Sequence, residues 1–467
     1  MTKTLHGEVA PIYRFVLRSK RGFRFIMQTR TLNKSVKRVG MIAYTTYPFD
    51  GRVRLEAESL VQWGYEVYFL VPKEGQTAKE YTLAGVNVIE LNVDEYGGKS
   101  KVQYLLSYMV FMALAFVACT RLYFKHRVSV IHVHNMPDIL IFSTLIPRLF
   151  GCRIVLDLHD TIVETYQAKF GKCFAVTLFL LRLEERICCA IAHQIICVNH
   201  VQREAVLSRG IPASKVATVI TMPRFNGDNR SPAPARSDSR FCMVNHGTLS
   251  KRLGNDLIIE ATARLIREIP GFELHIIGGG DGLPELQSIV RELSLEEHVH
   301  LHKGVPWDQL AAKLECMDVG IVANRVNVAT KLMLPSKLID YVVLGIPAIV
   351  PRLPAIEYYF SDEMVTFFTP EDLDSMVAAT VGLYRNAMRR RSQAESAKAF
   401  LREHGWERGG LRKIYEQLIP RNENTERAPY LDKNEAAPSR FPDNGADDVK
   451  LARHASVEEV NIGVKDN

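Results

Sequence analysis

The chain has 467 residues, with 59 lysines and arginines against 52 aspartates and glutamates, so its formal net charge is +7. Its 47% hydrophobic and 24% charged content is that of a globular protein. This composition argues against a wholly disordered chain, a collagen or a membrane protein of many spans, and the length predicts two or three domains.

The positive charge is concentrated at the N-terminus. Residues 1–38 hold ten lysines and arginines and one acid, Glu8, which gives +9; the remaining 49 basic and 51 acidic residues give −2. We therefore expect a near-neutral body with a basic arm, residues 1–37, and no nucleic-acid partner. Within the arm, residues 11–27 place apolar side chains on one helical face and cations largely beside or opposite them, which is typical of a helix in an anionic membrane surface. The alternatives are a disordered extension and a helix docked on the body.

Further signals bear on the cellular compartment. The eight cysteines show no CxxC pair and no metal-ligand spacing, which predicts buried, reduced thiols in a cytosolic protein. No secretory signal pattern is visible. Residues 102–119 contain no charge and are at the lower limit of length for a bilayer span. They lie between two strand-like runs, so a buried or membrane-grazing helix is favoured over a span. We expect a cytoplasmic protein, peripheral at the inner face of the cytoplasmic membrane.

Short apolar runs alternate with helical patterns over residues 38–222. The expected strands are 38–46, 66–72, 86–92, 128–135, 153–160, 194–199 and 216–220. Continuous apolar strands separated by helices indicate a parallel sheet covered on both faces. The segment is therefore predicted to be one doubly wound domain.

A second domain of the same kind follows a linker. Residues 223–240 are rich in Pro, Ser, Asn and Gly and carry no apolar periodicity. Strands are then expected at 240–248, 272–278, 298–304, 319–323, 347–352 and 365–369. The second domain spans 241–386, a helical segment spans 387–420, and 421–467 are expected to be disordered. The predicted fold is α/β, with two doubly wound Rossmann-like domains facing a cleft.

Ligands of such sheets bind beyond the carboxyl ends of the strands, so the first candidates lie there. Gly51, near a helix start, allows close approach of a phosphate, and Arg52 lies beside it; the alternative is a simple turn with surface arginines. His132 and His134 have the spacing of two metal ligands on a strand, but no third ligand is evident, so no metal is predicted. His134, Asn135 and Arg52 are assigned to the acceptor or the cleft.

A polar cluster ends the strand at 153–160. His159 is suited to hydrogen-bond a substrate hydroxyl, and Asp160 to accept a proton or orient an acceptor. Polar groups at such a place cost free energy unless they are paired or used. The alternative is a helix N-cap formed by Asp160 or Thr161.

The second domain offers cations and glycines. Gly247 follows a strand, and Arg252, in the loop before a helix, suits a diphosphate. Gly278 belongs to a glycine-rich segment, 275–287, that lacks GxGxxG spacing and is by itself a weak nucleotide-binding signal.

A helix start near the end of this domain adds further candidates. Pro335 and Ser336 open the helix, and Lys337 in its first turn favours phosphate. Asp340, one turn on, can accept both hydroxyls of a ribose, or can merely pair with Lys337.

Taken in order, these segments resemble the retaining glycosyltransferases of family 4, which have the GT-B fold. The most specific matches are GTLSKRLGNDLIIEA, LHIIGGGDGLPELQ and LPSKLIDYVVLGIPAI, supported by DGRVRLEAE and VLDLHD in the first domain. The resemblance implies a nucleotide-diphosphate sugar as donor substrate, no cofactor, and no metal. It assigns Arg252 and Lys337 to the diphosphate, Asp340 to the ribose, Gly51 to the phosphates and His159 to the donor sugar.

One departure from the family pattern is clear. The usual E-x7-E pair is absent, since its second position is Asp340 and eight residues earlier stands Leu332. Backbone amides around residues 335–337 are expected to replace the missing carboxylate contact. The expected reaction is transfer, with retention, to a glycan or lipid-linked acceptor in cell-surface polysaccharide or glycolipid synthesis. The alternatives are a GT-B-fold nucleotide-sugar epimerase and a catalytically silent, membrane-bound scaffold.

Overall fold

The computed structural model describes residues 37–95, 101–171, 174–220, 240–404 and 406–419. Most of the predicted basic arm, nearly all of the predicted linker and the whole predicted disordered tail lie outside these residues. The described residues form two sheets and the helices that cover them.

The first sheet has eight strands in the order β3-β4-β2-β1-β5-β6-β7-β8. They are β1 (Arg38–Ile42), β2 (Glu66–Lys73), β3 (Glu80–Leu83), β4 (Val86–Asp94), β5 (Val130–His134), β6 (Arg153–Leu158), β7 (Gln194–Cys197) and β8 (Val216–Thr218). All pairings are parallel except that of β3 with β4, which is an antiparallel hairpin. The sequence pattern did not predict β3, because this edge strand is largely exposed and lacks an apolar run.

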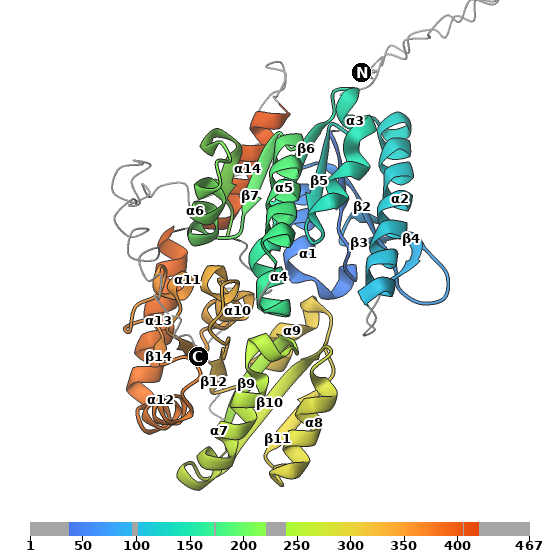
Figure 1. Cartoon of the computed structure of the whole chain (residues 1–467). Coiled ribbons are helices and arrows are strands. Elements are labelled where there is room, and N and C mark those ends of the chain that lie inside the picture. The colour runs from blue at the N-terminus through green and yellow to red at the C-terminus, as the bar shows by residue number, and fades with distance from the viewer. Residues whose placement is uncertain (1–36, 96–100, 172–173, 221–239, 405, 420–467) are drawn as a thin grey trace, which may run out of the picture. The chain divides into compact units, whose positions relative to one another are not determined.

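Helices cover both faces of this sheet (Figure 1). One face packs against α2 (Lys101–His126), the 3-10 segment η2 (Asp138–Thr144), α5 (Ala175–Ile191) and α6 (His200–Ser208), with α3 (Leu145–Leu149) beside α2 and η2. The other face packs against α1 (Gly51–Gln62) and α14 (Trp406–Leu418). Asp50 caps α1 by accepting a hydrogen bond from Val53 N, and α4 (Ile162–Phe170) follows β6.

The helix α2 is largely exposed, so of the two predicted alternatives, a buried or a membrane-grazing helix, the buried one is wrong. Phe111, Ala115, Cys119 and Leu122 form its buried stripe against the sheet. Only 22% of its most apolar window is buried, and Leu105–His126 is the one described helix long and apolar enough to cross a membrane. Because α2 connects two strands of the same sheet, β4 and β5, it is a crossover helix of that sheet.

The second sheet has six parallel strands in the order β11-β10-β9-β12-β13-β14. They are β9 (Phe241–Thr248), β10 (Phe272–Gly279), β11 (Val299–His302), β12 (Val319–Ile321), β13 (Ala348–Pro351) and β14 (Thr366–Phe368). One face packs against α7 (Asn255–Glu268), α8 (Leu283–Glu292) and α12 (Leu373–Arg385). The other packs against α9 (Trp307–Leu314), α10 (Ser336–Leu344), α11 (Pro354–Glu357) and α13 (Ala387–His404). The predicted α/β fold with two Rossmann-like sheets is confirmed.

The last helical stretch serves both sheets. Within it, α13 packs against the second sheet, whereas α14 packs against the first through Leu411, Ile414 and Tyr415. The Tyr415 hydroxyl lies 2.9 Å from Nδ1 of His132 on β5, and both side chains are buried. The last described helix, α14, therefore packs against the first sheet.

Candidate active site at the carboxyl ends of the strands

Asp157, near the end of β6, is the centre of a buried polar cluster in the first sheet. Asp157 is fully buried and pairs with Arg52 in the first turn of α1. Arg52 Nη2 lies 2.8 Å from Oδ1 and 3.0 Å from Oδ2 of Asp157. Burial alone would raise the pKa of Asp157. The charge of Arg52 and of His159, with hydrogen bonds from His134 and His159, instead holds that pKa well below its usual range.

The position of Arg52 corrects one of the sequence-based alternatives. Arg52 and Arg54 have side chains only 14% and 5% exposed, so the alternative of a simple turn with surface arginines is wrong. Arg52 also pairs with Glu56 one turn on, at 3.1 Å. Arg52 thus pairs with Glu56 and Asp157 of its own domain, and these ion pairs link α1 to the end of β6.

His159 lies at the edge of this cluster. Its Nε2 is 3.1 Å from Asp157 Oδ2 and 3.1 Å from His134 Nδ1, and its backbone N–H donates to Asn135 Oδ1 at 2.7 Å. Burial would lower the pKa of His159, but Asp157 outweighs that effect and raises it. With Nε2 held by the carboxylate and the side chain 23% exposed, Nδ1 is the ring nitrogen left to donate to a ligand.

Asp160 faces the second sheet. Its Oδ2 is 3.6 Å from Arg252 Nη2, and its backbone carbonyl accepts from Asn135 Nδ2 at 2.7 Å. The N-cap position of α4 belongs to Thr161, whose side chain makes no capping hydrogen bond. The structure therefore brings together Asp160 and Arg252, which the sequence had assigned to the acceptor and to the diphosphate.

Arg252 is incompletely satisfied. It lies in the 3-10 segment η4 (Lys251–Leu253), and its side chain is 30% exposed. Its Nη1 is buried, with no hydrogen-bond partner among the described residues. A buried guanidinium donor without an acceptor is costly, and an anionic ligand would satisfy it.

Lys337 and Asp340 lie on α10, which begins at Ser336 with Pro335 as its N-cap, as the sequence predicted. Lys337 Nζ donates to Asn245 Oδ1 at 2.6 Å, whereas Asp340 Oδ2 lies 3.5 Å from His246 Nε2. Burial lowers the pKa of Lys337 to about 8 and raises that of Asp340 to about 7, and the mutual attraction of the two charges opposes both shifts. At neutral pH Lys337 is thus mostly charged, whereas Asp340 is about half ionised.

The glycines of the second sheet allow close backbone contact. A Cβ on Gly278 would lie 1.9 Å from the carbonyl oxygen of Gly247, on the neighbouring strand β9. A Cβ on Gly247, whose φ is +103°, would lie 3.8 Å from Lys337 Cε. Gly278 is therefore required by the close approach of β10 to β9, and Gly247 by its backbone conformation beside Lys337.

Gly51 has a different surrounding from the one expected. A Cβ there would lie 2.2 Å from Cδ1 of Trp307 on α9, so the indole fills the space in which a phosphate was expected. Arg54 lies over the Trp307 ring at 5.7 Å and pairs with Asp308 at 3.3 Å. Within this structure, Gly51 serves the contact between α1 and α9.

The two histidines of β5 have more ligand-type neighbours than the sequence suggested. Glu56, His132, His134 and Asp157 bring one ligand atom each within 4.8 Å of one another, all from buried residues. The expectation that no third ligand joins the histidines is therefore wrong. Arg52 pairs with both carboxylates of this group, Glu56 and Asp157, so these four residues and Arg52 form a cluster that contains paired charges. The absence of a metal stays a prediction.

The backbone near Leu332 is held by the first domain. Leu332 ends the 3-10 segment η5 (Thr330–Leu332), and its carbonyl oxygen accepts from Asn199 Nδ2 at 2.8 Å. The N–H groups of Ser336 and Lys337 lie in the first turn of α10, where a helix offers no acceptors of its own. These amides are available in the place where the missing carboxylate contact was expected.

Two family descriptions match the chain. Residues 51–220 match the glycosyl transferase 4-like domain, and residues 240–386 match the glycosyl transferases group 1. Together the two matches span about two thirds of the chain, and each covers one of the two sheets.

A curated relative matches over a shorter stretch. The chain is 33% identical over 106 residues to the GDP-mannose-dependent alpha-(1-6)-phosphatidylinositol monomannoside mannosyltransferase of Mycolicibacterium smegmatis. The match covers 21% of this chain and 28% of the relative, so the chain spans little more than a quarter of that relative's length.

Solved structures share the fold at low identity. Sucrose-phosphate synthase from Thermosynechococcus elongatus superposes with a TM-score of 0.65 at 16% identity, covering 82% of this chain and 99% of the other. Anabaena HepE in complex with UDP-glucose gives 0.60 at 14%, covering 82% and 99%. WaaG, a glycosyltransferase involved in lipopolysaccharide biosynthesis, gives 0.59 at 14%, covering 82% and 100%.

Proposed function

The chain belongs to the family 4 type of glycosyltransferases with the GT-B fold and uses a nucleotide sugar, and on that premise we propose a finer function. It transfers one sugar, with retention of configuration and without a bridging metal, to a glycan or lipid-linked acceptor in cell-surface polysaccharide or glycolipid synthesis. It works in the cytoplasm, held at the inner face of the membrane by its basic arm, residues 1–37.

The second sheet supports the donor half of this proposal. The observation that carries it is Lys337, a buried lysine whose pKa is lowered to about 8 at the N-terminus of α10. A desolvated ammonium gains most when a strong anion replaces the lost water, and a diphosphate is such an anion. The unpartnered Nη1 of Arg252 supplies a second donor, and Asp340 supplies an acceptor for ribose hydroxyls.

The proposed step breaks the bond between the anomeric carbon and the leaving phosphate oxygen. The acceptor oxygen forms its bond to the same face of the anomeric carbon, and its proton passes to the leaving phosphate oxygen. Lys337 and Arg252 stabilise the negative charge that grows on the diphosphate, which is the role otherwise taken by a metal. His159 donates from Nδ1 to the donor sugar, and Asp160 orients the acceptor hydroxyl.

The first test is a thermal-shift panel of nucleoside diphosphates and their sugars, followed by mass analysis of products. We expect Lys337→Ala to lose most of the stabilisation by the best donor, and Lys331→Ala, an exposed lysine on η5, to keep it. Stabilisation by none of the panel, or an equal shift in both variants, would contradict the donor assignment and favour the silent scaffold. A free epimerised sugar nucleotide as the sole product would favour the epimerase.

The arm is tested separately, because it lies outside the described residues. We expect deletion of residues 1–35 to lower recovery with membranes while the thermal midpoint of the remaining chain stays unchanged. Equal membrane recovery of both forms would exclude the arm as a membrane anchor.

A further inference from the structure

The helices that cover one face of the first sheet turn apolar side chains toward solvent. On α2 these are Leu105, Leu106, Met109, Val110, Phe116, Val117 and Phe124. On and just before α5 they are Phe174, Val176, Phe179, Leu180, Leu183 and Ile187. We call these thirteen residues the α2–α5 apolar surface. Leu149 and Phe150, 76% and 60% exposed, lie at the end of α3, next to α2.

A helix that covers a sheet normally buries one stripe and exposes a polar one. The helix α7 of the second sheet does so, since its exposed residues Arg264, Arg267 and Glu268 are all charged. In contrast, α2 buries Phe111 and Cys119 against the sheet and exposes further apolar residues on the opposite side. Exposed apolar side chains in this number along one helix indicate a contact with something other than water.

The two helices lie on the same face of the sheet. Both pack into one apolar cluster with β5 and β6, and η2 packs against α2 as well as α5. Figure 1 shows α2, α3 and α5 as neighbouring helices over the strands. The apolar residues of the two helices therefore belong to one side of the domain.

The exposed charged side chains on these helices are all positive. Arg121 and Lys125 are exposed on α2, and Arg182 and Arg186 are exposed on α5. No acidic side chain is exposed in the described parts of α2, α3 and α5. Apolar residues bordered by cations match a bilayer surface that carries anionic lipids.

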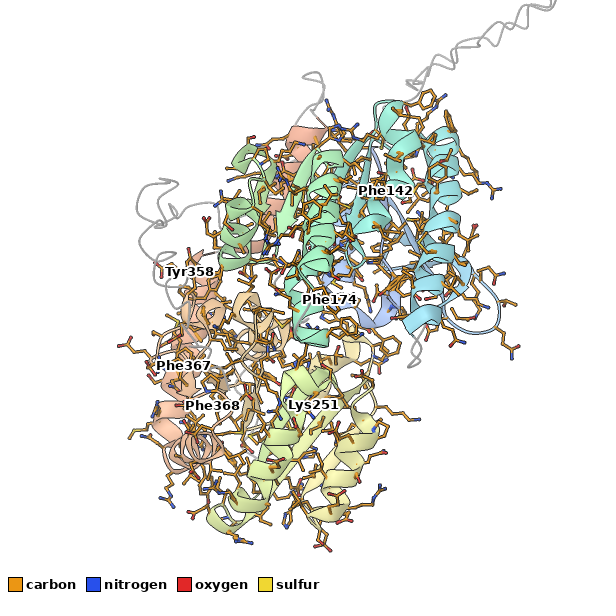
Figure 2. All side chains as sticks on the ribbon, viewed as in Figure 1. Phe142, Phe174, Lys251, Tyr358, Phe367 and Phe368 are labelled. Carbon is orange, nitrogen blue, oxygen red and sulfur yellow. The ribbon has the colours of Figure 1, made fainter. Side chains whose placement is uncertain are left out.

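The exposed apolar residues extend along the two helices and reach the active-site edge of the sheet. Crossover helices run opposite to the parallel strands they connect, so their N-termini lie at the carboxyl edge of the sheet. Residues 105–117 of α2 and residues 174–180 lie nearer to that edge, whereas Phe124, Leu183 and Ile187 lie among the exposed cations of the two helices. Phe174, labelled in Figure 2, precedes α5 and follows α4, which itself begins just after Asp160. The α2–α5 apolar surface thus extends to the edge of the sheet at which the candidate active site lies.

We propose that the α2–α5 apolar surface inserts into the interface of an anionic lipid bilayer and presents the active-site edge to an acceptor carried by a lipid in that bilayer. The acceptor half of this proposal rests on the proposed function; the docking half does not. A symmetric contact between two copies is disfavoured, because the exposed cations of α2 and α5 would meet either apolar residues or the same cations, with no exposed acidic side chain in the described parts of α2, α3 and α5 to pair with them. A span by α2 is inconsistent with β4 and β5 lying in one sheet.

The docking test uses the full-length chain with vesicles of phosphatidylcholine, with and without phosphatidylglycerol. The variant Phe179→Trp places a fluorescent indole on the surface, and Met388→Trp, at a residue 83% exposed on α13, is its matched control. We expect a blue shift, and quenching by brominated lipid, for Phe179→Trp alone. Because this signal is local to the surface, binding by the N-terminal arm does not produce it.

Removal of apolar area is the second arm of the test. We expect Phe174→Ser with Phe179→Ser to lower the partition of the protein onto anionic vesicles by about tenfold or more, with Met388→Ser without effect. Circular dichroism and gel filtration check that each variant stays folded. Unchanged partition of the double variant, or a wild-type dimer that this double variant dissociates, would overturn the proposal.

The acceptor half has its own readout. With the donor found by the thermal-shift panel, labelled sugar should enter the lipid extract of isolated membranes, and the double variant should lower this transfer several-fold. Thermal stabilisation by the donor should stay unchanged, since the substituted residues lie outside the donor half of the site. Vesicle docking with transfer only into the aqueous fraction would overturn the lipid-linked acceptor and leave the docking surface in place. Failure of all donors in the panel would instead contradict the proposed function.

Discussion

The affinity for the donor should depend on pH through two groups on α10. Lys337 must be charged to hold a diphosphate, and its pKa lies at about 8. Asp340 must be ionised to accept hydrogen bonds from the ribose hydroxyls, and its pKa lies at about 7. Affinity should therefore be greatest between these two values and fall on both sides.

The titrations of Lys337 and Asp340 determine how far the affinity for the donor falls on each side. Near pH 7.5 about 60% of the molecules carry both charges, whereas at about pH 6 or pH 9 roughly 10% do so. The dissociation constant should thus rise about sixfold in either direction, which corresponds to about 1 kcal/mol.

Calorimetric titration with the intact nucleotide sugar measures this profile, because a diphosphate ester, unlike a free nucleoside diphosphate, has no titration of its own near neutrality. Lys337→Met should remove the alkaline limb, Asp340→Asn the acidic limb, and Lys331→Ala neither. An affinity that stays constant from pH 6 to pH 9 in folded wild-type protein would refute the assignment of both groups.

Three further predictions concern stability and metals. Asp157→Asn should lower the free energy of unfolding by about 3 kcal/mol in urea, because the buried Arg52 loses the closer of its two charge partners, whereas Asp308→Asn, at a 57% exposed side chain, should change it little. A loss below about 1 kcal/mol would contradict this pairing. The pKa of Asp340 is raised from 3.8 to about 7, so without donor the unfolded chain ionises first and stability falls as pH rises from about 4 to about 7. Asp340→Asn should therefore unfold at a higher temperature than wild type at pH 9 and at a similar one at about pH 4, and the same difference at both pH values would argue against it. Sugar transfer should survive chelation by EDTA; activity that is lost with EDTA and restored by Mg²⁺ would show that Lys337 and Arg252 do not replace a metal.

Local sequence signals predicted the elements that carry the donor half. Pro335 and Ser336 mark the start of a helix, and Lys337 and Asp340 follow at one-turn spacing, so their common location needs no knowledge of the tertiary structure. The strands were also predictable, although β1 ends at Ile42 and not at residue 46. Polar and aromatic residues after Ile42 leave the sheet and form the 3-10 turn Tyr47–Phe49 before α1.

The first-domain cluster was less predictable because it depends on strand order. Arg52 on α1 meets Asp157 on β6 only because β1, β5 and β6 are neighbours in the sheet. Glu56 was missed, since a glutamate in a helical pattern is typical of a solvent-exposed position; its only local signal is the position four residues after Arg52. The contact of Gly51 with Trp307 could not be predicted from the sequence either, because the two residues lie on helices, α1 and α9, that cover different sheets.

Both halves of the site contain buried polar groups without hydrogen-bond partners among the described residues. In the first half, Asp157 accepts from Arg52, His134 and His159, so its charge is balanced without a ligand, whereas Nε2 of His132 and Nε2 of His134 are buried without a hydrogen-bond partner. In the second half, Nη1 of Arg252, Nδ2 of Asn245 and Oδ1 of Asn324 are buried without hydrogen-bond partners among the described residues. Unpartnered groups of this kind destabilise a fold unless a ligand completes them. Asn245 lies in β9, Arg252 follows β9 and Asn324 follows β12, at the edge where α10 begins. A diphosphate and ribose bound there would supply the missing acceptors and donors together. The second sheet is therefore the half whose folding free energy should rise most on donor binding, and hydrogen exchange of β9 and α10, compared with that of β5 and β6, measures this difference directly.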